Sequence, residues 1–534
     1  MTETSSERVL VPTYDSKGNP AWNSTMSTPD NSYAVCHIVP DRIIPIIFIP
    51  GVMGSNLKGI GTAKNIRWRL DGASSMLGWL TRGPIERKRY LTPETMTVDD
   101  GGTLPEGTSQ HKDELKRRGW GEVGAMSYAP FLVWLENALS DFSNPHGGER
   151  DRLIDRPIGA SKGESALRKD EVALSYRYRF PVHACGYNWL DSNAIAAKRL
   201  QQRINEVIAR YKGERKQCEK VILVTHSMGG LVARYCSEVL GMSDKIFGIV
   251  HGVMPSIGAA AVYRRFKSGT EGDWIAAKIL GEDAAEMTAV LSGAPGPLQL
   301  LPTQEYGNNW LKINDGKTVF SFPQRGDPYE EIYTIRGKWW SMCEEDLISP
   351  VVPALGQTKP QAKLDQDWIK FATIISERVE TFHKSIQGKY HPNTYAFYGS
   401  SPRFLSYGTV MWKGGTTWGE TWFTSRKANT LNAKMTNEDN IHTSRSLAAP
   451  LEGEGWKKGV HQVFTISGPD ENGDGTVPHR SGIHPKDSPC VKSIVEVAVG
   501  HEPAYKDSRA AMQFTLRAIV RIAQAVKGTS LAYE

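Results

Sequence analysis

The sequence predicts an α/β fold, with a mostly parallel sheet flanked by helices and a large inserted cap. Residues 43–50 form a continuous apolar run, which is typical of a strand buried on both faces of a parallel sheet. A second apolar run, residues 220–225, ends close to a serine and continues as a helical pattern. Residues 191–211 repeat apolar side chains at helical spacing. We therefore expect a helix that covers one sheet face and makes the right-handed crossover between parallel strands.

The order of these elements divides the chain into four parts. Polar residues and proline dominate the N-terminus, which predicts an irregular arm. Strand–helix alternation then begins, is interrupted by one insertion and is lost again where we expect the cap. Apolar runs at 461–467 and 491–499, followed by an amphipathic helix, indicate that the sheet resumes. The parts are the arm (1–42), the first part of the sheet domain (43–257, with an insertion at about 58–125), the cap (258–460) and the second part of the sheet domain (461–534).

Two features of the cap have more than one interpretation. Residues 364–386 step apolar side chains by three or four, which predicts a helix that packs on the body or, alternatively, faces a membrane as a lid. Large amphipathic rings suit a wall for acyl chains, a lipid surface or an ordinary hydrophobic core. The cap is rich in such rings, at Trp339, Trp340, Trp368, Trp412, Trp418 and Trp422.

The composition excludes several classes of protein. The 534 residues carry a net charge of only +6 with scattered Lys and Arg, so nucleic acid is not an expected partner. The six cysteines show neither metal-ligand spacing nor a disulfide framework, and reduced thiols are expected. Because the first residues lack a secretory signal and no apolar run is long enough to span a membrane, we expect synthesis in the cytoplasm. Export by a signal-independent machine remains open.

Ser227 stands where the second apolar run turns into a helix. A serine in such a turn occupies a strained backbone corner and projects its hydroxyl away from the sheet, where a base and an acyl substrate can reach it. Thr225 replaces the first glycine of the common Gly-x-Ser-x-Gly pattern, and Gly229 is the expected second glycine. The pattern alone fits a nucleophile and an ordinary turn equally well.

A nucleophilic serine requires a histidine as its base. Of the 13 histidines, His501 alone lies between the last apolar strand and the final helix, where the base follows in this chain order. His479 and His484 are the alternatives. They lie between the last two predicted strands, on the path back to the opposite sheet edge.

Asp474 is the preferred carboxylate to orient that histidine. Glycines flank it, so the backbone can turn sharply and aim the carboxylate, whereas Asp470 suits a surface turn. The same stretch begins like a calcium loop, but Ser481 stands where an EF-hand has its bidentate acid. We therefore expect no cofactor, and a calcium ion bound elsewhere in the cap is left open.

Five motifs, in this order along the chain, resemble the lecithin:cholesterol acyltransferase-like branch of the α/β-hydrolase lipases. They are Pro-Gly-Val-Met-Gly-Ser-Asn-Leu at 50–57, Gly-Tyr-Asn-Trp at 186–189, Thr-His-Ser-Met-Gly-Gly at 225–230, Gly-Asp-Gly-Thr-Val-Pro at 473–478 and Gly-His at 500–501. The resemblance implies an α/β-hydrolase fold. It also implies Ser227 as nucleophile, Asp474 as acid, His501 as base, and the amides of Met53 and Met228 as the oxyanion hole.

The large cap and the Gly-His-Glu-Pro stretch at 500–503 resemble, more loosely, the phospholipase effectors of type VI secretion systems. This resemblance implies a lipid or membrane surface as substrate, action at a target-cell membrane, and a cognate immunity protein and a secretion-machine component as partners. The expected activity is hydrolysis of lipid carboxylic esters through an acyl-enzyme intermediate. The alternatives are a lipid acyltransferase and a non-catalytic binding protein with the same fold.

Overall fold

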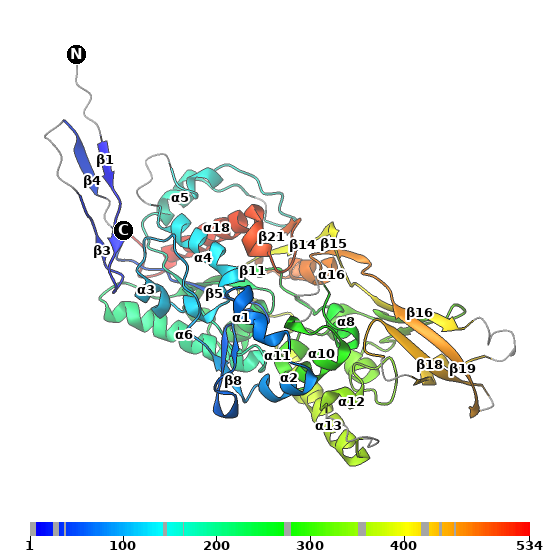
Figure 1. Ribbon diagram of the computed structural model, residues 1–534. Coiled ribbons are helices and arrows are strands. Elements are labelled where there is room, and N and C mark those ends of the chain that lie inside the picture. Colours follow the sequence, from blue (N-terminus) through cyan, green and yellow to red (C-terminus); the bar gives the residue numbers. More distant parts are fainter. Residues whose placement is uncertain are drawn as a thin grey trace.

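The computed structural model contains a central six-stranded sheet whose neighbouring strands are all parallel (Figure 1). The structure describes residues 7–24, 31–36, 39–141, 147–163, 165–271, 279–350, 359–417, 427–436, 440–452 and 455–533. In spatial order the strands are β21 (Val491–Val497), β14 (Thr394–Gly399), β11 (Ile246–Gly252), β10 (Val221–His226), β5 (Ile46–Ile49) and β9 (Val182–Ala184). The predicted α/β-hydrolase fold class is confirmed.

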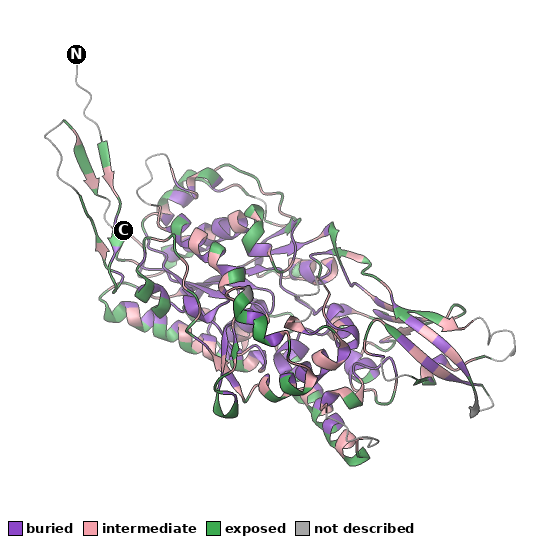
Figure 2. Ribbon diagram, viewed as in Figure 1, coloured by how far each residue is buried: buried purple, intermediate pink, exposed green. Residues whose placement is uncertain are grey.

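Helices cover both faces of this sheet, which explains the unbroken apolar runs. Alternate residues of β10 belong to two different hydrophobic clusters, because successive strand side chains point to opposite faces. Leu223 lies in the cluster that includes α6 (Asn193–Gly213) and α7 (Gly229–Arg234). Val224 lies in the cluster that includes α4 (Ala125–Leu139) and α18 (Arg509–Ala523). Figure 2 shows the buried sheet between these layers.

A second six-stranded sheet projects from one side of the molecule and is mostly antiparallel (Figure 1). In spatial order its strands are β13 (Val319–Phe322), β12 (Leu311–Asn314), β16 (Val410–Thr416), β19 (Gly455–Ile466), β18 (Ser444–Leu451) and β17 (Lys434–Met435). Its side chains Trp412 and Phe464 share one hydrophobic cluster with Leu223 of the central sheet. The two sheets therefore share a continuous core.

The predicted division of the chain is wrong at two strands. Residues 461–467 were expected to resume the central sheet, but most of them belong to β19 of the second sheet. Gln462, Phe464 and Ile466 are buried while the intervening residues are more exposed, the alternation of an antiparallel strand with one covered face. Conversely, β14 lies within the predicted cap yet pairs with β11 and β21. The helix predicted at 364–386 directly precedes its short apolar run, but both were assigned to the cap because strand–helix alternation is lost around them.

The amphipathic helix predicted at 364–386 is present, and its apolar side packs inward. It consists of α13 (Gln361–Thr373), a π-helical stretch (Ile374–Glu380) and α14 (Thr381–Ile386). Six of its apolar side chains are buried, namely Trp368, Phe371, Ile375, Val379, Phe382 and Ile386. Trp339, Trp340 and Trp412 are buried as well, whereas Trp418 and Trp422 lie outside the described residues. The described side chains of the helix and these three tryptophans therefore pack in the core and do not form a lipid-facing surface.

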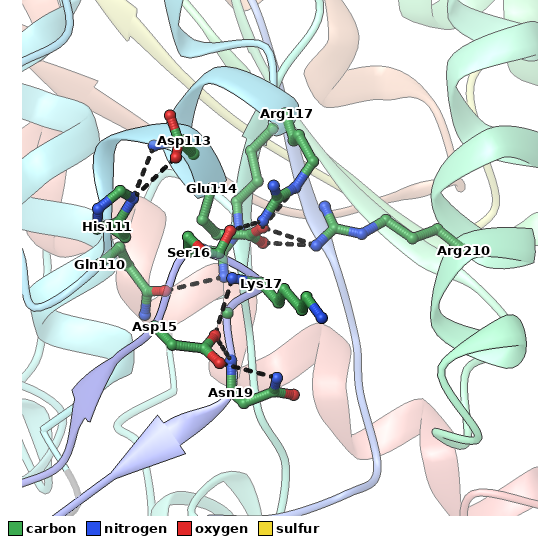
Figure 3. Close-up of polar contacts among 12 residues, drawn as sticks. Asp15, Ser16, Lys17, Asn19, Gln110, His111, Asp113, Glu114, Arg117 and Arg210 are labelled. Carbon is green, nitrogen blue, oxygen red and sulfur yellow. Dashed lines mark hydrogen bonds and ion pairs between the residues drawn. The ribbon is translucent and has the colours of Figure 1, made fainter.

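The N-terminal arm is more regular than expected. It contains two small sheets, β1 (Glu7–Leu10) with β4 (Tyr33–Cys36) and β2 (Thr13–Tyr14) with β3 (Pro20–Ala21). Figure 3 shows the turn between β2 and β3 against the helix that carries Glu114 and Arg117. Arg117 and Arg210 of α6 both donate to the Glu114 carboxylate. Arg117 also donates to the carbonyl of Ser16. This charged cluster fixes the inner end of the arm to the body.

The predicted insertion at about 58–125 contains a small sheet and several short helices. Its strands are β6 (Leu57–Gly59), β7 (Arg67–Trp68) and β8 (Met96–Val98), and its helices include α1 (Ala73–Met76), α2 (Pro84–Tyr90) and α3 (Lys112–Arg117). Across the part of the chain that the structure describes, no helix has both the length and the apolar character needed to cross a membrane.

All six cysteines are free thiols, and four of them are buried. Burial raises the pKa of Cys185 to about 11 and that of Cys218 to about 12, and it also raises the pKa of Cys236 and Cys343. Cys490 is partly buried, and Cys36, on β4 of the arm, is exposed. The prediction of reduced thiols agrees with this arrangement.

Candidate active site

Ser227 follows the last residue of β10 and has a φ of +51°, a left-handed conformation that a non-glycine residue rarely adopts. Its side chain is buried, and its amide donates to the carbonyl of Gly252 at the end of β11. A Cβ atom at Gly229 would lie 2.6 Å from the carbonyl oxygens of Ile49 and Pro50. Glycine there allows the helix after Ser227 to begin directly against the end of β5.

Thr225 fits the position of the missing glycine because its hydroxyl has a partner. Thr225 is buried on β10, and its Oγ1 lies 2.9 Å from Nδ1 of His251 on the adjacent strand β11. The Tyr505 hydroxyl donates to the Thr225 carbonyl. A threonine at this point therefore buries no unsatisfied hydroxyl.

The structure brings Ser227, His501 and Asp474 together. Nε2 of His501 lies 2.8 Å from Oγ of Ser227, and Nδ1 of His501 lies 2.8 Å from Oδ2 of Asp474. Because an ionised carboxylate can only accept, Nδ1 carries the proton and Nε2 is the acceptor that faces the serine hydroxyl. The His501 amide also donates to the Asp474 carbonyl at 2.7 Å, which fixes the two loops to each other.

The Asp474 carboxylate is held in place from its other side. Its Oδ1 accepts from the amides of Thr476 at 2.9 Å and Val477 at 2.7 Å. Gly475, with a φ of +93°, supplies the sharp turn that this geometry requires. Gly399, the last residue of β14, lies directly beneath Asp474, since a Cβ there would be 2.5 Å from the Asp474 Cβ. The sequence analysis did not identify Gly399 as part of the site.

The rival residues have other partners. Nδ1 of His479 lies 2.9 Å from Oγ of Ser400, and Nε2 of His484 lies 3.9 Å from the carboxylate of Glu305. The Asp470 carboxylate accepts from the amides of Gly408 and Thr409. Among the described residues, no group of three or more His, Cys, Asp or Glu side chains is arranged to hold a metal ion. A calcium site in the cap remains a hypothesis.

The loop after β5 presents the first of the two expected oxyanion amides. Met53 has a φ of +62°, and its carbonyl accepts from the indole nitrogen of Trp68 at 3.0 Å. The Tyr187 hydroxyl donates to the Pro50 carbonyl at 2.9 Å, so the Gly-Tyr-Asn-Trp motif supports this loop. In the described part of the chain, no hydrogen bond occupies the amide of Met53 or Met228. An oxyanion hole requires such amides without a partner in the protein.

Sequence reasoning missed two further residues of the site, Tyr128 and His226. Nδ1 of His226 lies 3.0 Å from the Tyr128 hydroxyl, and Nε2 of His226 lies 2.9 Å from the carbonyl oxygen of His501. The Gly51 amide donates to the Tyr128 hydroxyl at 3.1 Å. The adjacency of His226 to Ser227 was the only signal in the sequence, and no motif marked Tyr128, which lies in the first turn of α4.

Two comparisons with known proteins indicate the fold and the class of protein. The family model described as "PGAP1-like alpha/beta domain" matches residues 191–263, which include the crossover helix, β10 and Ser227. A chain of the crystal structure of the Tle4–Tli4 complex is 27% identical, with a TM-score of 0.74, over 90% of this chain and 98% of that chain. No curated protein matches the sequence.

The fold and these matches define an α/β-hydrolase similar to lipases, and they support a lipase- or phospholipase-type hydrolase. The predicted resemblance to lipase-like α/β-hydrolases and to type VI secretion effectors is confirmed.

Replacing Gly399 by Ala tests the support beneath Asp474. The new methyl group would lie 2.5 Å from the Asp474 Cβ, so Asp474 must shift and its hydrogen bond to His501 is disturbed. We expect Ser227 to react with a fluorophosphonate roughly tenfold to a hundredfold more slowly, because displacements of about 1 Å cost that much reactivity. Gly213→Ala is the matched control, since a Cβ there meets no atom within 4 Å. Equal reactivity of the two variants would show that Gly399 does not support Asp474.

Proposed function

We propose that this protein hydrolyses carboxylic ester bonds of lipids through an acyl-enzyme intermediate at Ser227. The observation that carries the proposal is the unbroken hydrogen-bond chain from Asp474 through His501 to Ser227, with both bonds at 2.8 Å. This is the arrangement that activates a serine hydroxyl as a nucleophile, in which the carboxylate orients and stabilises the protonated imidazole.

In the first half of the reaction, Oγ of Ser227 bonds to the ester carbonyl carbon and Nε2 of His501 takes the hydroxyl proton. The carbonyl π electrons move onto the oxygen, which accepts hydrogen bonds from the amides of Met53 and Met228. When the tetrahedral intermediate collapses, the bond to the leaving alcohol breaks and His501 donates its proton to that alcohol. Water, deprotonated by His501, then attacks the acyl group, and the fatty acid leaves as the proton returns to Ser227.

A lipid surface as the source of substrate is supported by side chains near the base. Phe404 and Leu405 of β15 (Ser401–Ser406) are 38% and 41% exposed, although both are large and apolar. The Phe404 ring lies beside Gly500, and the Phe404 carbonyl accepts from the amide of Gly475, which follows Asp474. The neighbouring Arg403 is also exposed. Apolar side chains with an adjacent cation suit contact with a bilayer that carries anionic headgroups.

A dedicated protein partner is part of the proposal. The similar solved structure is a complex of Tle4 with Tli4. We infer that this chain likewise binds a cognate immunity protein, and that it is exported through a secretion-machine component to act on the membrane of a target cell.

Ser227→Ala removes the proposed nucleophile. Hydrolysis of a soluble ester such as p-nitrophenyl butyrate is expected to fall at least about a thousandfold, because the remaining groups cannot form an acyl-enzyme. Ser237→Ala, which changes another buried serine, serves as the control and should retain activity. Full activity of Ser227→Ala would refute the mechanism. Product analysis with an added alcohol separates hydrolysis from acyl transfer.

Replacing Phe404 and Leu405 by Asp tests the lipid-facing surface. We expect hydrolysis of phosphatidylethanolamine–phosphatidylglycerol vesicles to fall by about tenfold per residue, because each side chain loses its favourable transfer into lipid. Hydrolysis of p-nitrophenyl butyrate should not change. Val319→Asp, at an exposed apolar residue of β13 in the second sheet, is the control. Parallel losses on both substrates would argue against a role in lipid contact.

The proposed site of action predicts toxicity at a membrane. Directed to the periplasm of a susceptible bacterium, the wild-type chain is expected to arrest growth and release free fatty acid. Ser227→Ala, expressed at the same level, should do neither. Normal growth with the wild-type chain, despite equal expression of active protein, would contradict an antibacterial role.

A further inference from the structure

We propose that Tyr128 and His226 are positioning residues that hold the loop of the base and the loop of the oxyanion amides in a fixed relation. The proposal rests on the function proposed above. The contacts form one chain, in which the Gly51 amide meets the Tyr128 hydroxyl, Tyr128 meets His226, and His226 meets the backbone carbonyl of His501. Tyr128 and His226 are both buried.

The hydrogen bonds in this chain have a single consistent direction. A carbonyl oxygen can only accept, so Nε2 of His226 carries a proton and donates it to the His501 carbonyl. Nδ1 of His226 is then the acceptor for the Tyr128 hydroxyl proton, and the Tyr128 oxygen accepts from the Gly51 amide. Every polar atom in the chain has a partner only while His226 is neutral. Burial, supported by the nearby His501, lowers the pKa of His226 and keeps the ring neutral.

This chain of hydrogen bonds ends at the oxyanion loop on one side and at the base on the other. The relative position of these two parts matters most for the reaction. Gly51 belongs to the loop that carries the Met53 amide, and a Cβ atom at Gly51 would lie 3.1 Å from the Ser227 Cβ. At the other end, the carbonyl that His226 binds belongs to His501 itself. Ser127, next to Tyr128 in α4, donates to the Glu502 carboxylate at 2.5 Å and ties the base loop to the same helix. The first turn of α4 therefore sets the distance between the base and the oxyanion amides.

The protein contains a second series of hydrogen bonds, outside the site, that also joins a tyrosine, a histidine and a backbone carbonyl. The Tyr329 hydroxyl lies 2.7 Å from Nδ1 of His383, and Nε2 of His383 lies 2.8 Å from the carbonyl oxygen of Gln299. Tyr329 and His383 are buried, and burial lowers the pKa of His383 to about 4. Because the tyrosine–histidine–carbonyl part of the two hydrogen-bond chains is the same, Tyr329→Phe is a matched control for Tyr128→Phe.

The test compares kcat and KM for p-nitrophenyl butyrate in Tyr128→Phe and Tyr329→Phe, with active enzyme counted by fluorophosphonate titration. We expect Tyr128→Phe to lower kcat by roughly tenfold to a hundredfold with little change in KM, because a small displacement of the base weakens proton transfer rather than substrate binding. Tyr329→Phe is expected to lower the melting temperature to a similar extent and to leave kcat unchanged. Titration restricts the comparison to folded, reactive molecules.

Two substitutions of His226 separate the ends of the chain. His226→Gln keeps a donor near the Nε2 position, and His226→Asn keeps an acceptor near the Nδ1 position. If these hydrogen bonds act as one unit, the double variant Tyr128→Phe/His226→Gln should lose much less kcat than the product of the two single-variant losses. Equal kcat in Tyr128→Phe and Tyr329→Phe, or fully additive effects, would overturn the inference. The proposed function fails separately, if Ser227→Ala remains active.

Discussion

A left-handed serine can stand at the end of β10 because β5 and β11 hold that strand from both sides. Such a conformation costs on the order of 1–3 kcal/mol, and it persists where the surroundings leave no alternative. Residues Val221–Val224 are completely buried, so the strand cannot shift to relieve the strain. The amide of Ser227 donates to the carbonyl of Gly252. The helix that follows packs so closely on the end of β5 that position 229 has room only for glycine. The position of the hydroxyl is therefore a property of the whole sheet.

The cap is an extension of the body rather than a separate lid. Trp412 and Phe464 of the second sheet lie in the same hydrophobic cluster as Leu223 of β10. Four of the tryptophans that suggested a lipid-facing wall instead lie in this shared core, namely Trp339, Trp340, Trp368 and Trp412. Large apolar side chains exposed near the base are found on β15, at Phe404 and Leu405.

The sequence predicted what depends on local pattern and on the direction of parallel strands. Ser227 and His501 each follow an apolar run, and the carboxyl ends of parallel strands meet at one sheet edge, so their proximity could be expected. The pairing of β19 could not be expected, because an alternating run does not identify its neighbour. The bridge formed by Tyr128 and His226 leaves no periodic trace, since it joins residues that are distant in the chain. Gly399 was missed for the same reason, because only the fold reveals that Asp474 lies above it.

The burial of the cysteines bears on how the chain would respond to a change of redox environment. Four thiols lie in the core, and burial keeps them protonated and therefore poor nucleophiles for disulfide exchange. The native state thus requires no oxidant to form and offers little for an oxidant to attack. Cys36, exposed on the arm, is the thiol most accessible to oxidation, and its reaction there would leave the covalent structure of the catalytic body unchanged.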